Sequence, residues 1–416
     1  MSPMPPPPPT SPARPARAAL RRAHARLASR RRGGERGFAL LLVLLMTTIA
    51  IIVVAELAYQ AGLEILAANN VSDQGLIEYA IDGQFEIALA NLKLDKKSSD
   101  KDLDAETETW NNKDIRQRTD GDVALTMRIF DEAGKFNLVR LVTGNEAQQL
   151  RAKEVFIRIL DLFRDGIAED KSKGGDLNQG EAEEVADRII KYLKREGATG
   201  QVPKPKTLPA SVPLLLDEIQ FVDTKDNHMM DVLMVDLKVK DQVAPGLHRF
   251  VTVYGAQRIN VNSAPLVVLK ALFSQSGDQS YAQAIIDRRR GQADTSSSSS
   301  VPAMSSSSGS SSGTTDAGAG NPFETVQGLV DGSVNGLTDD VLRKNGIDAA
   351  VELDVKSDVF GIRIQGATKR TQRDELYVVE RAKAADGTVG FRFLLHQERT
   401  DPLLTTEEDT SAESTP

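Results

Sequence analysis

Few residues in this chain of 416 residues are arranged as catalytic groups usually are. Asp131 and Glu132 are adjacent carboxylates, the residue type that serves general acid–base catalysis. They stand in the turn-forming stretch 131–134, where we expect neighbouring acids to be solvated. The four histidines are scattered, no HExxH motif is present, and the absence of cysteine excludes thiol nucleophiles, zinc–thiolate sites and disulfides. The sequence therefore predicts a protein that is not an enzyme.

The dipeptide Gly37-Phe38 indicates chemistry that another protein performs on this chain. Residues 1–37 hold nine arginines and one acid, and Phe38 begins a run of 18 uncharged residues that ends at Ala55. As a helix this run is roughly 27 Å long, enough for a bilayer core, and the arginines hold its N-terminal end in the cytoplasm. A glycine flanked by charge before an apolar helix is typical of a prepilin-type leader. Its peptidase cuts after the glycine and methylates the new amine, here that of Phe38.

Two other interpretations of this segment stay open, a secretory signal cut after Ala55 and a simple uncleaved anchor. Leu42 bears on the choice because it is the fifth residue after Gly37. Most pilins and pseudopilins have Glu there, and its carboxylate pairs with the terminal ammonium of a neighbouring subunit, which sets register. Leu42 either argues against a pilin-type protein or marks a subunit that does not need the pair.

The remaining chain is acidic, with 42 basic and 58 acidic residues, which makes it a poor match for nucleic acid. Helical spacing of apolar residues over 56–95 predicts one long amphipathic helix that continues the membrane segment. Alternation over 123–129 predicts a strand, segment 136–290 has mainly helical patterns, and alternation after Ser357 predicts an antiparallel sheet. The Ser/Gly/Thr tract 294–320 cannot bury a core and is predicted to be disordered.

Five further segments carry the remaining motifs, which are DEAGKFNLVRL from Asp131, EEVADRIIKYL from Glu183, PLLLDEIQFV from Pro213, TVYGAQRINVNSAPLVVLKAL from Thr252 and VFGIRIQGATK from Val359. Together with the leader, these segments resemble in content and order the K-type minor pseudopilin of type II secretion systems, general secretion pathway protein K. The resemblance spans residues 34 to about 397. K-type members also lack the Glu at the fifth mature position, so Leu42 agrees with it.

The resemblance implies an α+β fold. A pilin-like N-terminal membrane helix and an antiparallel β-sheet would carry a large inserted all-α domain of two helix-hairpin-helix (SAM-like) lobes. In chain order, the implied parts are a cleaved basic leader (1–37), the transmembrane part of the helix (38–55), the periplasmic helix with the first strand (56–135), the inserted helical domain (136–345) with a disordered loop (294–320), the C-terminal strands (346–399) and a disordered tail (400–416). Asn260, Asn262 and Pro265 are expected to be structural residues of a helix-hairpin-helix, as turn and cap residues.

The resemblance also implies an assembly role: a minor pseudopilin that caps the tip of the periplasmic pseudopilus and helps to initiate its assembly, for export of folded proteins across the outer membrane. The implied partners are the I-type and J-type minor pseudopilins, the prepilin peptidase and the inner-membrane secretion platform. The chain would be a single-pass inner-membrane protein with its C-terminal part in the periplasm. No cofactor and no nucleic acid are expected.

One departure from the family concerns calcium, which the family's helical domain can bind through an acidic loop. The corresponding segment here is KREGATGQVPKPKTLP, starting at Lys194, and after Glu196 no carboxylate follows until Asp217. Calcium needs six or more oxygen ligands, several of them from carboxylates. We therefore expect no metal site in this segment.

Two alternative functions stay open. The stretch from Ile259 to the arginines 288–290 also resembles the helix-hairpin-helix of DNA-uptake proteins, which holds phosphate with backbone N–H groups of a Gly-rich hairpin. Here the hairpin FSQSGDQS has one glycine and an Asp, and the arginines could equally cap a helix C-terminus. A packing unit without nucleic acid is favoured. A minor pilin of a type IV pilus is the other alternative.

Overall fold

The computed structural model describes residues 15–98, 103–111, 117–165, 177–194, 216, 233–239, 242–291, 321–332, 334–383 and 388–399, with only the backbone of residues 15–37, 97, 98, 239, 242 and 383. The segment 195–209, in which we expect no calcium site, lies outside the described residues. The Ser/Gly-rich tract 294–320, the tail 400–416 and, except for Leu216, the PLLLDEIQFV motif lie outside them too.

The chain divides into two compact units, Met1–Ser72 and Asp73–Pro416, and helix α1, Pro15–Ser98, contributes to both. In the first unit the large apolar side chains from Phe38 onward are exposed, Leu44 to 63% for example. An 18-residue window of α1 has a mean hydropathy of 3.0 and none of it is buried, so this helix is long and apolar enough to cross a membrane. The predicted long N-terminal helix is confirmed.

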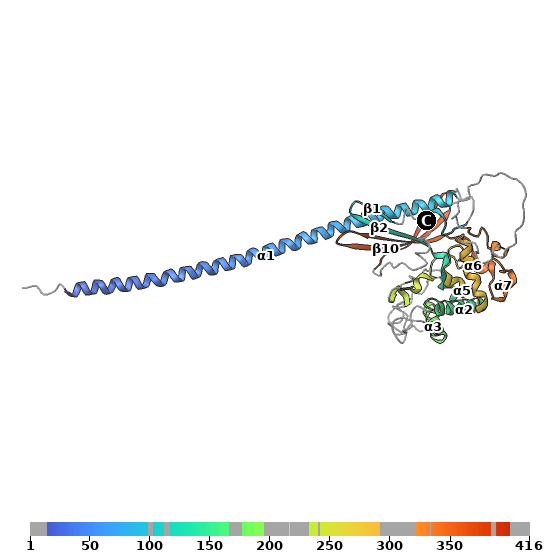
Figure 1. Cartoon of the computed structure of the whole chain (residues 1–416), viewed down its shortest axis with the longest axis horizontal. Helices are drawn as coiled ribbons and strands as arrows, with labels where there is room; N and C mark the ends of the chain where they lie inside the picture. Colours follow the sequence, from blue (N-terminus) through green and yellow to red (C-terminus); the bar gives the residue numbers. More distant parts are fainter. Residues whose placement is uncertain are drawn as a thin grey trace, which may run out of the picture. The chain divides into compact units, whose positions relative to one another are not determined.

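In the second unit, α1 packs one face against an antiparallel sheet (Figure 1). The buried residues of this face are spaced as expected for one side of a helix, and they are the positions that the sequence pattern predicted. They are Ile77, Ala80, Ile81, Gln84, Phe85, Ala88 and Leu92.

The sheet has five strands in the order β1-β2-β9-β10-β11, with every neighbouring pair antiparallel. The strands are β1 Gln117–Asp120, β2 Val123–Asp131, β9 Val359–Ala367, β10 Gln372–Lys383 and β11 Val389–Glu398. Strand β2 lies beside β9, with Met127 opposite Ile364, so the chain leaves the sheet after β2 and returns at β9. The face against α1 buries Leu125, Met127 and Ile362 among its apolar residues.

Between β2 and β9 the described chain is mainly helical (Figure 1). Its buried apolar residues, together with Val359 of β9 and Val378 of β10, form a core separate from the one under α1. The α-helices are α2 Glu146–Leu162, α3 Gln179–Lys194, α5 Leu266–Leu272, α6 Ser280–Arg289, α7 Asp339–Lys344 and α8 Ala349–Glu352. The same region has short 3₁₀ helices, η3 Glu132–Gly134, η4 Leu138–Leu141, η7 Leu247–Arg249, η8 Ser276–Gln279 and η9 Val326–Leu329, and a further one, η1 Thr109–Asn111, lies between α1 and β1.

This region also contains three short strand pairs, two of which join distant parts of the chain. Two are parallel, β3 Phe136–Asn137 with β6 Val251–Thr252 and β7 Ile259–Asn260 with β8 Leu353–Asp354, and one is antiparallel, β4 Leu237–Val239 with β5 Gln242–Ala244. The pairs β3–β6 and β7–β8 place the turn after β2, the start of the INVNSAP stretch and the approach to β9 next to one another.

Candidate functional site

The membrane-type segment of α1 contains the residues predicted for processing and assembly. Gly37, of which only the backbone is described, is helical, Phe38 is 69% exposed and Leu42 is 42% exposed. The hydroxyls of Thr47 and Thr48 donate to the Leu44 carbonyl over 2.9 and 2.8 Å. The polar side chains of this run are thus satisfied inside the helix, as a lipid environment requires. Cleavage and methylation at Gly37-Phe38 and the role of Leu42 remain predictions.

Asp131 and Glu132 were predicted to be solvated. The prediction was wrong, because both side chains are buried. Asp131 Oδ1 accepts the Ala133 N–H at 2.7 Å, and Oδ2 accepts Asn260 Nδ2 at 2.8 Å and the hydroxyls of Ser263 and Ser357. Burial raises the pKa of Asp131 to about 6, against the lowering effect of these hydrogen bonds. The carboxylate is the centre of a buried structural network.

The same turn fixes Glu132 and brings the backbone close to the INVNSAP stretch. Glu132 accepts the Thr252 hydroxyl at 2.5 Å and pairs with Lys135 at 2.6 Å. At Gly134 an added Cβ would lie 2.9 Å from the backbone carbonyl oxygen of Ser263. The DEAG turn therefore needs glycine at its fourth position because two chain segments touch there.

Asn260 and Asn262 do more than shape their own turn. Asn260 Oδ1 accepts the Asn262 N–H, as a turn residue would, but its Nδ2 also donates to the Asp104 carbonyl at 2.8 Å. The Asn262 side chain brackets the backbone of Phe323, with Nδ2 donating to its carbonyl at 2.9 Å and Oδ1 accepting its N–H at 2.8 Å. Pro265 lies directly before α5, with φ −62°, where its missing N–H is not needed.

A charged cluster that the sequence did not indicate continues this network toward the end of α1. Arg381 of β10 is 1% exposed; it donates to Asp104 and to the Ser357 carbonyl, and it pairs with Asp95 at 3.5 Å. Asp104 Oδ2 in turn accepts the Ser357 N–H at 2.9 Å. A chain of buried hydrogen bonds thus runs from α1 through Arg381 and Ser357 to Asp131.

This cluster includes the one group of carboxylates in the described residues whose spacing could suit a metal ion, Asp95, Asp104 and Glu108. Their chemistry does not require one. The Arg381 guanidinium already pairs with both Asp104 and Asp95, and Glu108 accepts the Ala105 N–H at 2.8 Å and the Trp110 indole N–H at 3.3 Å. Burial raises the pKa of Glu108 to about 7. The donor set fits a buried cationic side chain.

The arginines considered for DNA binding are largely built into the helical region. Arg289 is 4% exposed and donates to the carbonyls of Val261 and Ala264, while Arg288 stacks over the Phe323 ring at 5.0 Å. Arg289 thus holds the segment before α5, which differs from the helix C-terminal cap considered for this cluster.

The hairpin between α5 and α6 also lacks a free phosphate cradle in its described contacts. The Gln275 N–H donates to Asn345 Oδ1 at 3.0 Å, and the Asp278 N–H donates to the Gln275 carbonyl at 3.0 Å. The Asp278 carboxylate itself accepts Asn345 Nδ2 at 2.8 Å. These groups stabilise a packing unit.

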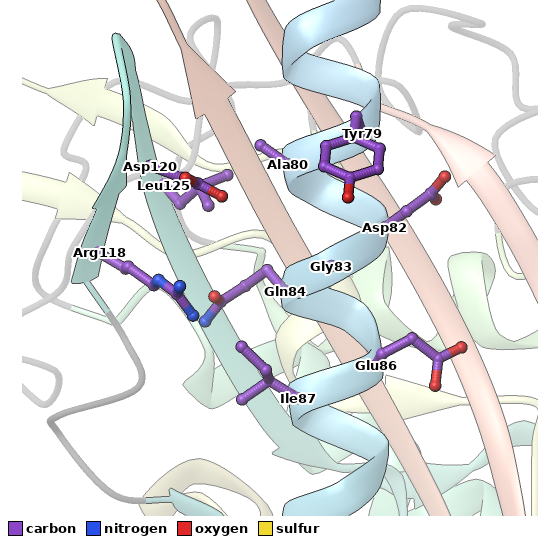
Figure 2. A pocket seen from close by; sticks show the side chains of 10 residues that line it. All are labelled: Tyr79, Ala80, Asp82, Gly83, Gln84, Glu86, Ile87, Arg118, Asp120 and Leu125. Atoms are coloured by element: carbon purple, nitrogen blue, oxygen red, sulfur yellow. The ribbon is translucent and has the colours of Figure 1, made fainter.

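A groove lies between α1 and the β1–β2 hairpin, with a volume of about 390 Å³ (Figure 2). Its wall is one side of α1, and Arg118 and Asp120 of β1 form its floor together with Leu125. Arg118 is opposite Leu125 and Asp120 is opposite Val123, so both charged residues lie on the sheet face that α1 covers further along. The remaining lining residues are Tyr79, Ala80, Asp82, Gly83, Gln84, Glu86 and Ile87.

Comparison with known proteins yields a structural likeness only. No protein-family model matches the chain, and no curated protein matches its sequence. A chain in the crystal structure of the GspK–GspI–GspJ complex from the type 2 secretion system of enterotoxigenic Escherichia coli is similar in fold, with a TM-score of 0.52 and 16% identity. The similarity covers 80% of this chain and 99% of that one. The expected α+β, pseudopilin-like fold is confirmed.

Proposed function

We propose that this chain is a minor pseudopilin of a type II secretion system, anchored once in the inner membrane with its C-terminal part in the periplasm. The observation that carries the proposal is one helix, α1, that combines an exposed apolar run with a face packed on an antiparallel sheet. The structural likeness to a chain of the GspK–GspI–GspJ complex supports it. We propose no catalytic role, no resident metal and no nucleic-acid ligand.

We further propose a position at the tip of the pseudopilus, where the chain helps to start assembly. Leu42 is an apolar residue at the position where the other subunits have a carboxylate. This subunit therefore cannot form an ion pair with the terminal ammonium of a neighbour. The helical region between β2 and β9 adds bulk that would block another copy from stacking above. Both features suit a subunit that other pseudopilins contact from one side only.

Before assembly, prepilin peptidase would remove residues 1–37 and methylate Phe38. The mature chain would then associate with I-type and J-type minor pseudopilins at the inner-membrane secretion platform. Mass spectrometry of the protein extracted from membranes tests the first step. We expect a methylated Phe38 as the N-terminus. An intact residue 1–37 segment, or an N-terminus at Glu56, would count against the proposal.

Co-purification tests the second step. The full-length chain, co-expressed in membranes with the peptidase and with the I-type and J-type pseudopilins encoded beside it, should be recovered with both in detergent. Recovery with the major subunit of a type IV pilus instead would favour the type IV alternative. Polymers of this chain alone would contradict the tip position.

A further inference from the structure

One side of α1 next to the groove carries no charged residue between Leu76 and Leu94. We refer to this side as the uncharged flank; it consists of Leu76, Tyr79, Ala80, Gly83, Ile87, Ala90 and Leu94. The spacings of three and four residues place them along one line of a helix. The exposed charged residues of the same stretch, such as Glu78, Asp82, Glu86 and Lys93, fall on the other exposed side.

Much of the uncharged flank is open to solvent. Leu76 is 51% exposed, Tyr79 78% and Leu94 60%. Gly83 is exposed, and a Cβ added there would meet no atom within 4 Å. Large apolar side chains gathered in this way on one line of a helix, beside a groove, are a common feature of protein contact surfaces.

The shape of the groove suits a helix. Its α1 wall runs from Tyr79 to Ile87, roughly 12 Å at about 1.5 Å per residue, and the uncharged flank continues along the helix beyond both ends. Small residues at Ala80 and Gly83 lower the middle of this wall, and Tyr79 and Ile87 rise on either side of it (Figure 2). Two helices that pack side by side approach to about 8–10 Å, and small residues at the crossing permit the close end of this range.

The charges around the groove define the partner's chemistry. Asp82 and Glu86 stand one turn apart on the rim away from β1, and the floor adds Asp120 beside a single arginine, Arg118 (Figure 2). Three carboxylates against one guanidinium favour a basic partner.

We propose that the groove binds a helix of a neighbouring pseudopilin. That helix has small and apolar residues on its contact face and Lys or Arg four residues apart along the edge that meets Asp82 and Glu86. This inference rests on the proposed function and specifies which side of α1 makes the contact.

The experiment compares Gly83→Trp with Gly75→Trp in the full-length chain, co-expressed in membranes with the I-type and J-type pseudopilins. Both glycines are exposed on α1 and have open space around a new Cβ, but Gly75 lies about 12 Å before Gly83 along the axis and outside the groove. We expect Gly83→Trp to reduce recovery of the partner about tenfold, and Gly75→Trp to change it less than about twofold. Equal recovery with both variants would overturn the inference and leave the proposed function standing.

A charge exchange tests the chemistry of the contact. Asp82→Lys with Glu86→Lys should reduce recovery, and Lys→Glu or Arg→Glu changes on the partner helix should restore it. Failure of every such exchange to restore recovery would overturn the basic edge.

Cross-linking tests the occupant, because the chain has no cysteine of its own. Gly83→Cys should form disulfides with single cysteines placed along a partner's N-terminal helix, with a helical period. Cross-links to a partner's strand, or between two copies of this chain, would overturn the helical occupant. If the wild-type chain recovers neither pseudopilin, the proposed function itself fails.

Discussion

Asp131 accepts four hydrogen bonds at a buried position. The pKa of this carboxyl is raised by burial to about 6 in the folded chain, from 3.8 when unperturbed. Between these values the folded state holds a proton that the unfolded state has lost. The free energy of unfolding therefore falls, as far as Asp131 is concerned, when the pH rises from about 4 to about 6.

Asp131→Asn should remove this contribution. We expect the stability lost by the variant, relative to wild type, to be greater at pH 4 than at pH 7 by about 2–3 kcal/mol, since one pKa unit corresponds to about 1.4 kcal/mol. Chemical denaturation at a series of pH values measures it. Asp122→Asn, at an exposed position, is the control. Parallel profiles for Asp131→Asn and wild type would show that the carboxylate is not the titrating group.

Asn262→Ala should destabilise the helical region by about 2–4 kcal/mol, because it leaves the buried N–H and carbonyl of Phe323 without their hydrogen-bond partners. Asn70→Ala, at an exposed position of α1, should change the free energy of unfolding by less than about 0.5 kcal/mol. Urea denaturation of both variants gives the comparison. Equal midpoints would mean that the two hydrogen bonds of Asn262 make no net contribution to the free energy of unfolding.

Sequence reasoning selected Asn260 and Asn262 as turn and cap residues but gave no sign of their distant hydrogen-bond partners. Turn chemistry is local, so a turn at Asn260 could be predicted from neighbouring residues. The partners of these side chains are 156 residues away for Asp104 and 61 for Phe323. The burial of Asp131 has the same origin: only the packed chain brings Ser263 and Ser357 to it.

Among the elements, α1 was the most predictable, because helical period and hydrophobicity are both local signals. The strands at 123–131 and after Ser357 were predictable from alternation as well. Their order was not readable from alternation and was implied only by the resemblance, since nothing local says that β2 pairs with β9. The central charged cluster around Arg381 gave no sequence signal, because isolated charges in a strand usually face water.

The pairing of β2 with β9 requires a glycine at one point. Gly361 is opposite Phe130, and a Cβ added to it would lie 2.3 Å from the phenyl ring. Gly361→Ala should therefore lower the free energy of unfolding by about 1–3 kcal/mol, as overpacking does. Gly390→Ala in β11 meets no atom within 4 Å and is the matched control. Thermal denaturation of the two variants should separate them; an unchanged melting temperature for Gly361→Ala would contradict the packing described.

For the whole molecule, the first question is how the chain enters an assembly. Leu42→Glu would introduce the carboxylate that most pseudopilins carry at this position, outside the unit Asp73–Pro416. We expect secretion of a folded substrate to fall less than about twofold, because a subunit at the tip has no neighbouring terminal ammonium with which this carboxylate would form an ion pair. Immunoblotting of the medium measures secretion, and its complete loss with Leu42→Glu would argue against a tip position.

Gly37→Ala should accumulate unprocessed chain, since an added Cβ crowds the cut site. Immunoblotting of membranes measures the ratio of unprocessed to processed chain.

Strands β2 and β9 are neighbours in the sheet but far apart in the chain, and this affects the order in which the protein can fold. In the proposed topology, α1 is anchored before the rest of the chain crosses the membrane, so α1 and β2 would reach the periplasm first. Their apolar face can be covered only when β9 and β10 arrive, after all the helices between them. Contacts over such long sequence separations form slowly, and the waiting surface is prone to aggregate. Folding of the sheet would then be the last event. The core of the helical region would wait for the same strands, because it includes Val359 of β9 and Val378 of β10.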